Sequence, residues 1–118
     1  GVIQILIYGP NGYPVNSVAV YRKNWILFVP FWLFEQKMPY SEWTGSYVGN
    51  YDCGYSWGLH TEENVWKIVI TNYSNGVLVD DEFYIGYSLT DAPAVSSWNY
   101  NHNAHTLTPR QDKPVARY

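Results

Sequence analysis

The side chains that could carry catalysis in this sequence are two acidic groups and three histidines. The acidic groups are Glu62-Glu63 and Asp80-Asp81-Glu82, and the histidines are His60, His102 and His105. None of them lies in a recognisable nucleophile or metal motif. His102 and His105 fall in a segment with an extended pattern, so their rings should point to opposite sides. The run Asp80 to Glu82 reads as a solvated acidic turn, because calcium loops alternate their oxygen ligands around a glycine. We expect no catalysis, no metal and no cofactor.

The aromatic residues are the more informative group. They make up 19% of the 118 residues, while charged residues make up 14%, well below the roughly 25% of a typical domain. Several rings lie among Gly, Ser, Asn and Thr and are therefore poor core candidates: Tyr40, Trp43, Tyr47, Tyr51, Tyr55, Trp98 and Tyr100. A sugar site needs an aromatic plate with amide or hydroxyl groups beside it. Residues 98–103 offer this combination in Trp98, Asn99, Tyr100, Asn101, His102 and Asn103. The alternative to ligand binding is a structural role, in which these rings only cap the ends of the sheets.

The charge, the cysteine content and the length of the apolar runs limit which kinds of ligand the protein is expected to bind. A net charge of -3 gives no basic field for phosphates, so nucleic acid and anionic membrane surfaces are poor candidates. The single cysteine, Cys53, cannot form an internal disulfide. The longest apolar run, Trp25 to Phe34, is about half the length of a membrane-spanning helix, roughly 20 residues. A neutral glycan is therefore the favoured ligand.

Turn-forming residues recur along the chain and predict short strands that are separated by turns. Strands are expected over 2–8, 15–21, 65–71 and 82–88, with a closing strand near 104–107. Residues 25–34 read as a strand buried on both faces or as a homo-oligomer contact, with Pro30 requiring a bulge or an edge position. Residues 35–40 and the ring-rich stretch 40–55 read as loops. We predict an all-β fold, an antiparallel β-sandwich of the immunoglobulin/fibronectin-like class over 1–108, followed by a C-terminal tail over 109–118.

Two features bear on location. The triplet Asn72-Tyr73-Ser74 is an N-glycosylation acceptor on a predicted turn, where a glycan could be accommodated. The chain opens with Gly1 directly before an apolar run, which indicates a processed chain or an excised domain. The triplet favours an extracellular, secreted protein.

The order of the motifs resembles the starch-binding β-sandwich modules of carbohydrate-binding module family twenty-one, which occur in some fungal glucoamylases and in glycogen-targeting phosphatase subunits. The matching segments are 16–21, 29–31, 40–43, 65–70, 82–87 and 97–103. The chain departs from the family at Glu42, where an Asn is usual, and at Asn99-Tyr100, where Asp-Asn is usual. The resemblance implies that a glucan such as starch or glycogen stacks on Trp43 and Trp98, with the polar partners Asn99, Asn101 and Asn103. Together with the ring pattern, it gives the predicted site Trp43, Tyr47, Trp98, Asn99, Tyr100, Asn101 and Asn103.

A second resemblance gives the alternative function. Residues 51–58, followed by Asn64-Val65-Trp66, are similar to a W-D-C-P-W-G…N-x-W segment of aegerolysins, small β-sandwich proteins that bind membrane lipids. That resemblance implies that residues 25–34 contact lipid. A lectin of another sugar specificity is the third possibility. We predict a non-catalytic protein that binds a neutral polysaccharide.

Overall fold

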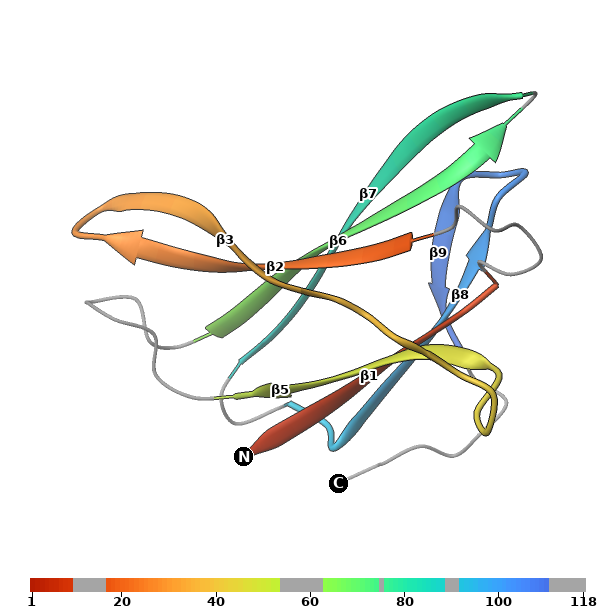
Figure 1. Ribbon diagram of the computed structural model, residues 1–118. Helices are drawn as coiled ribbons and strands as arrows, with labels where there is room; N and C mark the ends of the chain where they lie inside the picture. The colour runs from red at the N-terminus through yellow and green to blue at the C-terminus, as the bar shows by residue number, and fades with distance from the viewer. Residues whose placement is uncertain (10–16, 54–62, 75, 89–91, 111–118) are drawn as a thin grey trace.

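The computed structural model describes residues 1–9, 17–53, 63–74, 76–88 and 92–110. Within these ranges the chain is all β and forms two sheets, an arrangement compatible with a β-sandwich (Figure 1). Its strands are β1 (Val2–Tyr8), β2 (Ser17–Ile26), β3 (Val29–Lys37), β4 (Tyr40–Ser41), β5 (Ser46–Asp52), β6 (Glu63–Ser74), β7 (Val77–Ser88), β8 (Val95–Asn101) and β9 (Thr106–Pro109). In this described part of the chain, no helix has the length and apolar character needed to cross a membrane.

The two sheets have different strand patterns. One has five strands in the order β4-β5-β1-β8-β9, and the other has four in the order β3-β2-β6-β7. Strand β1 pairs with β5 in antiparallel fashion and with β8 in parallel fashion. All the other pairings in the described ranges are antiparallel. The predicted all-β class is confirmed, and the sheets are mainly but not wholly antiparallel.

The core is formed by alternate residues of the central strands. Ile3, Ile5 and Ile7 of β1 are fully buried in one hydrophobic cluster with side chains of β2 and β6. Those partners are Val18, Val20, Trp66, Ile68 and Ile70. Because side chains alternate between the faces of a strand, the intervening positions of β2 and β6 lie on the outer face of their sheet. Each fully buried aliphatic side chain contributes about 1.5–3 kcal/mol of hydrophobic free energy, so this layer dominates the stability of the fold.

Residues 25–34 differ most from the prediction. They form the end of β2, a two-residue turn at Leu27-Phe28 and the start of β3, and most of their apolar side chains are exposed. A single strand buried on both faces is therefore wrong. The edge position expected from Pro30 is confirmed, because β3 is an edge strand. The reason for the error is that the turn contains no Gly, Asn, Asp or Pro to mark it.

Three further segments predicted as turns or loops are strands. Residues 35–37 continue β3, and most of the ring-rich stretch from residue 40 to 53 forms β4 and β5. The acidic run 80–82 lies inside β7.

Asn72 lies inside β6 and is buried, so the predicted exposed glycosylation turn is also wrong. Tyr55 lies outside the described residues. The closing strand β9 is displaced from the predicted position by two residues, and the Arg110 N–H donates a hydrogen bond to the Ser97 carbonyl at 2.9 Å.

Candidate ligand-binding site

Two of the predicted ring residues face the core side of the five-stranded sheet. In the strand register Ile7 is opposite Tyr47 on one side and opposite Trp98 on the other. Paired residues of neighbouring strands share a face, so both rings lie on the same side as the buried Ile7. Both are partly buried and pack against the core cluster. The Trp98 indole N–H donates to the Ser96 hydroxyl at 2.6 Å. These rings can therefore offer a ligand only part of their surface.

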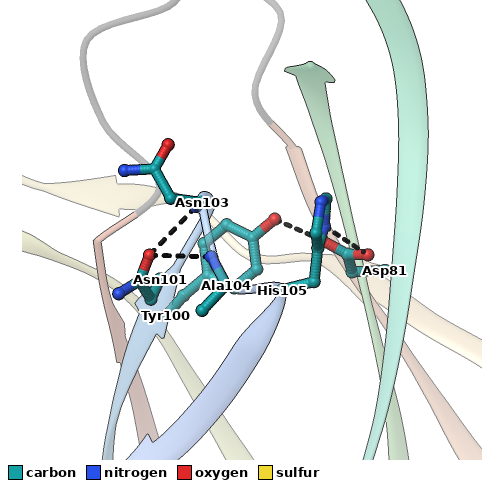
Figure 2. Close-up of polar contacts among 6 residues, drawn as sticks. All are labelled: Asp81, Tyr100, Asn101, Asn103, Ala104 and His105. Carbon is teal, nitrogen blue, oxygen red and sulfur yellow. Dashed lines mark hydrogen bonds and ion pairs between the residues drawn. The ribbon is translucent and has the colours of Figure 1, made fainter.

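The predicted polar partners do not share that face. Asn99 is paired with Tyr8 and with Thr108 and is exposed on the outer face of the sheet. The Asn101 side-chain oxygen accepts the backbone N–H groups of Asn103 and Ala104, at 2.9 and 3.1 Å (Figure 2). Asn101 thus closes the turn 102–105, while Asn103 is exposed on it. The amides beside Trp98 in the sequence are not brought together with its ring in space.

Tyr100 belongs to the core. Its side chain is 5% exposed, and its ring meets Phe83 edge-on at 6.0 Å between centroids. Its hydroxyl donates to Asp81 Oδ2 at 2.5 Å, across the gap between the two sheets (Figure 2). Burial, followed by this hydrogen bond, raises the pKa of Tyr100 to about 12. The expectation that Tyr51 and Tyr100 are poor core residues is wrong, because both rings are buried and each hydroxyl finds a partly buried polar partner. For Tyr51 that partner is Gln36 at 2.9 Å.

Asp81 also binds His105. The His105 Nδ1 lies 2.8 Å from Asp81 Oδ2 and 3.0 Å from Oδ1. His105 has a φ of 56° in the turn 102–105, so the extended conformation predicted for this segment is wrong at His105. A carboxylate that orients a histidine is a general-base arrangement. In the described part of the chain, however, the His105 ring has Asp81 as its sole hydrogen-bond partner, and no serine, threonine or cysteine is joined to the pair. We interpret this cluster as a link between the two sheets.

No metal centre is formed by the residues that the structure describes. Among them, no three His, Cys, Asp or Glu side chains lie close enough together to hold an ion. Cys53 is partly buried, and this burial raises the pKa of its thiol, so that the unreactive protonated form is favoured.

Trp43 is the predicted residue with an open ring. Its side chain is 99% exposed in the turn 42–45 that joins β4 to β5. The turn is held by a hydrogen bond from the Gly45 N–H to the Ser41 carbonyl at 2.9 Å, with Gly45 at a φ of 68° that favours glycine. At its base Tyr40 packs edge-on against Tyr47, with 5.3 Å between the ring centroids. An indole on such a turn can stack against a flat ligand.

Hydroxyl groups surround this turn. The Thr44 and Ser46 hydroxyls are 2.7 Å apart, and the Ser41 hydroxyl accepts the Thr44 N–H at 3.4 Å. Tyr40 is exposed as well. Strands β1 and β8 are parallel and β5 is antiparallel to β1, so the turns 42–45 and 102–105 lie at the same end of the sheet (Figure 1). The Trp43 turn therefore combines a ring with donors and acceptors.

A second aromatic surface was missed by the sequence analysis. On the outer face of the four-stranded sheet, Tyr21 is paired with Lys67 and Lys67 with Tyr84. Trp32 lies 5.5 Å from Tyr84, and Phe34 lies 5.5 Å from Tyr21, between ring centroids. The Lys67 ammonium is 4.8 Å from the Tyr21 ring and 5.3 Å from the Trp32 ring. No alternation in the sequence marks this face, because Phe31 and Leu33 beside Trp32 and Phe34 are apolar as well. We call these five residues the outer aromatic face.

Comparison with known proteins adds no further constraint on the site. No family model, no curated protein and no solved structure matches this chain. The function is therefore argued from the geometry of its own residues.

Proposed function

We propose that this protein is a non-catalytic glycan-binding module for a neutral polysaccharide, with an α-glucan such as starch or glycogen as the first candidate. The observation that carries the proposal is the 99% exposed Trp43 ring on a hydrogen-bonded turn. Burying about 60 Å² of indole under a sugar at about 25 cal/mol/Å² contributes about 1.5 kcal/mol. Because the turn is already closed by hydrogen bonds, little conformational freedom is lost on binding.

The roles within the proposed site follow from the geometry. Trp43 provides the plate for the C–H face of a sugar, and the hydroxyls of Tyr40 and Thr44 provide hydrogen bonds to its edge. Tyr47 and Trp98 support the turn end of the sheet from the core side. One such plate with a few hydrogen bonds gives an affinity in about the high-micromolar to millimolar range, as expected for a module that acts in several copies or beside other sites.

We also propose, as the finer fold class, an immunoglobulin/fibronectin-like sandwich. In that class binding residues gather on the loops at the ends of the sheets. The position of Trp43 on an end turn supports this proposal.

The test is retention of the protein on insoluble starch, together with titration by soluble maltooligosaccharides. Trp43→Ala should lower the affinity by about tenfold, the equivalent of about 1.4 kcal/mol, and should leave the melting temperature unchanged because the ring packs on nothing. Tyr73→Ala, which removes an exposed ring from β6, is the matched control and should bind like the wild type. To test the role of Trp98 we prefer Trp98→Phe to Trp98→Ala, because Trp98 packs against the core and the smaller side chain would leave a gap there.

Two results would contradict the proposal. If the wild type passes through starch, glycogen, cellulose, xylan and chitin columns unretained, the module does not bind a neutral polysaccharide. If Trp43→Ala is retained as strongly as Tyr73→Ala and the wild type, the site lies elsewhere. Retention on cellulose, xylan or chitin but not on starch would keep the glycan class and replace the sugar.

A further inference from the structure

The β2–β3 hairpin ends in a strongly exposed apolar tip. Its four residues, Ile26, Leu27, Phe28 and Val29, are between 65 and 74% exposed. The hairpin extends to one side of the molecule, away from the end that carries the β8–β9 turn (Figure 1). Ile26 and Val29 are paired on one face, while Trp25 and Pro30 are paired on the other, so both faces of the hairpin are apolar here. A rigid protein partner would cover only one face of such a hairpin. A fluid apolar phase, such as the interior of a lipid layer, would surround both of its faces.

The turn itself is built against its local preference. Leu27 has a φ of 53°, a left-handed conformation that a two-residue hairpin normally gives to Gly, Asn or Asp. A leucine in that region is a rare and strained choice. The tip therefore keeps apolar side chains at a position where polar turn residues would make the more stable hairpin. We call Ile26 to Val29 the hairpin tip.

The residues behind the hairpin tip change character in a definite order. Next to the tip is the ring of Trp25, and two residue pairs further along the hairpin is the ring of Trp32. Two cations lie beside and behind these rings: Lys23, which is paired with Trp32 and whose ammonium is 4.8 Å from the Trp25 ring, and Lys67, which lies further from the tip. An aliphatic tip followed by rings and cations matches the depth profile of a lipid monolayer, from the hydrocarbon to the interface and its phosphate headgroups.

The charges around these rings favour an anionic surface. Lys23 and Lys67 lie on the outer face beside these rings, whereas Arg22 is paired with the buried Trp66 and binds Asn64 on the core side. The acidic residues Glu35 of β3 and Glu82 of β7 lie further from the tip than these lysines. The net charge of -3 argued against such a surface, but exposed charges are screened beyond about 10 Å, and the ammonium groups of Lys23 and Lys67 lie beside the rings behind the tip. We propose that the hairpin tip inserts into the interfacial region of a lipid bilayer that carries anionic headgroups, with the aromatic residues behind it at headgroup level. This proposal is independent of glycan binding at Trp43.

The experiment measures co-sedimentation of the protein with vesicles of phosphatidylcholine alone and of phosphatidylcholine with about 30% phosphatidylserine. The wild type should bind the mixed vesicles, and binding should weaken at high salt. The double variant Leu27→Asn, Phe28→Gly supplies favoured turn residues, so it should fold at least as stably as the wild type. It should nevertheless lose about a hundredfold in vesicle partitioning, because two large side chains no longer leave water.

Two further variants separate the contributions. Lys23→Gln, Lys67→Gln should weaken binding to the mixed vesicles by about tenfold or more while leaving binding to pure phosphatidylcholine unchanged. Val77→Ser, Leu78→Ser changes two exposed apolar residues of the β6–β7 hairpin, which has Asp80 beside it in place of lysines, and should bind like the wild type.

Three outcomes would overturn the proposal. The first is a wild type that stays in the supernatant with both kinds of vesicle. The second is undiminished binding by the Leu27→Asn, Phe28→Gly variant. The third is a concentration-dependent dimer that this variant dissociates, without vesicle binding by the wild type, which would make the hairpin tip a contact between two copies. Binding that persists in the Trp43→Ala variant separates this surface from the glycan site.

Discussion

Replacement of Asp81 by alanine tests the link between the two sheets. Asp81 accepts hydrogen bonds from the buried Tyr100 hydroxyl and from the exposed His105 ring. Hydrogen bonds to a charged group are worth about 1.5–3 kcal/mol, and the truncation takes away the charged partner of a buried hydroxyl. Because His105 is exposed, its share lies at the low end of the range. We expect Asp81→Ala to lower the free energy of unfolding by about 3 kcal/mol.

The expected loss is large enough to measure in two ways. At about 2.1 cal/mol/K per residue, a chain of 118 residues has an unfolding entropy of about 0.25 kcal/mol/K, so the melting temperature should fall by about 12 °C. Urea unfolding followed by circular dichroism gives the free energy directly. The matched control is Asp80→Ala, which removes the neighbouring, exposed carboxylate that accepts the Thr71 hydroxyl at 2.7 Å, and it should cost less than about 1 kcal/mol.

A double-mutant cycle assigns the loss to the hydrogen bond. Tyr100→Phe alone should cost about 1 kcal/mol, and the coupling energy between the two substitutions should be about 1.5 kcal/mol. In Asp81→Asn the pKa of Tyr100 should fall, because the carboxylate that opposes its ionisation is gone. A loss below about 0.5 kcal/mol for Asp81→Ala, or a coupling energy of zero, would refute the assignment of these contacts as the link.

Three other predictions concern buried groups and backbone. Burial raises the pKa of Tyr51 and of Tyr100 to about 12, above the ordinary value near 10, so their contribution to stability is present below pH 10 and falls by about 1.4 kcal/mol per pH unit for each as pH rises to 12. Absorbance at 295 nm and circular dichroism should therefore show late tyrosines titrating together with unfolding; tyrosines that all titrate near pH 10 in the folded protein would contradict this. Gly9→Ala should cost about 3 kcal/mol or more in urea unfolding, because at a φ of 112° the added Cβ would stand 2.1 Å from the Tyr100 carbonyl oxygen, whereas Gly45→Ala, with a positive φ but open space, should cost about 1 kcal/mol. Asn72 is 3% exposed, so folded protein from a glycosylating host should keep its unmodified mass; a glycan on folded protein would show that β6 is not buried there.

The sequence predicts well those strands whose pattern of side chains fits only one kind of structure. The β-branched run of β1, the paired burial of Val18 and Val20 and the edge position of Pro30 all follow from local rules. The all-β class follows as well, because short strands with frequent turns leave few other architectures.

The burial of the remaining residues depends on contacts with residues far along the chain, which no local sequence pattern indicates. Tyr51 has polar neighbours in the sequence but turns inward, over Gly49, where an added Cβ would be 2.2 Å from its hydroxyl oxygen. Asp81 looks like part of a solvated turn until β8 brings Tyr100 across from the other sheet. Burial in such cases is decided by a partner far along the chain, which the sequence does not identify.

The candidate site is predictable only in part. Trp43 is exposed as expected from its polar neighbours, but Trp98 and its amides lie on opposite faces of one strand, as the period of two dictates once the strand is known. A buried strand and an exposed hairpin have the same composition, so the apolar run of residues 25–34 does not by itself reveal that its side chains are exposed.

The place of β1 between β5 and β8 has a consequence for how the chain folds. The four-stranded sheet is complete once β7 has been synthesised, but β1 then has β5 on one side and an open edge on the other. That edge closes when β8 arrives from the far end of the chain, and such long-range parallel pairing is slow. Until then the buried isoleucines of β1 lie beside unpaired backbone groups, an arrangement prone to aggregation. We expect docking of β8 to set the folding rate, and a chain that ends before β8 to aggregate through this strand.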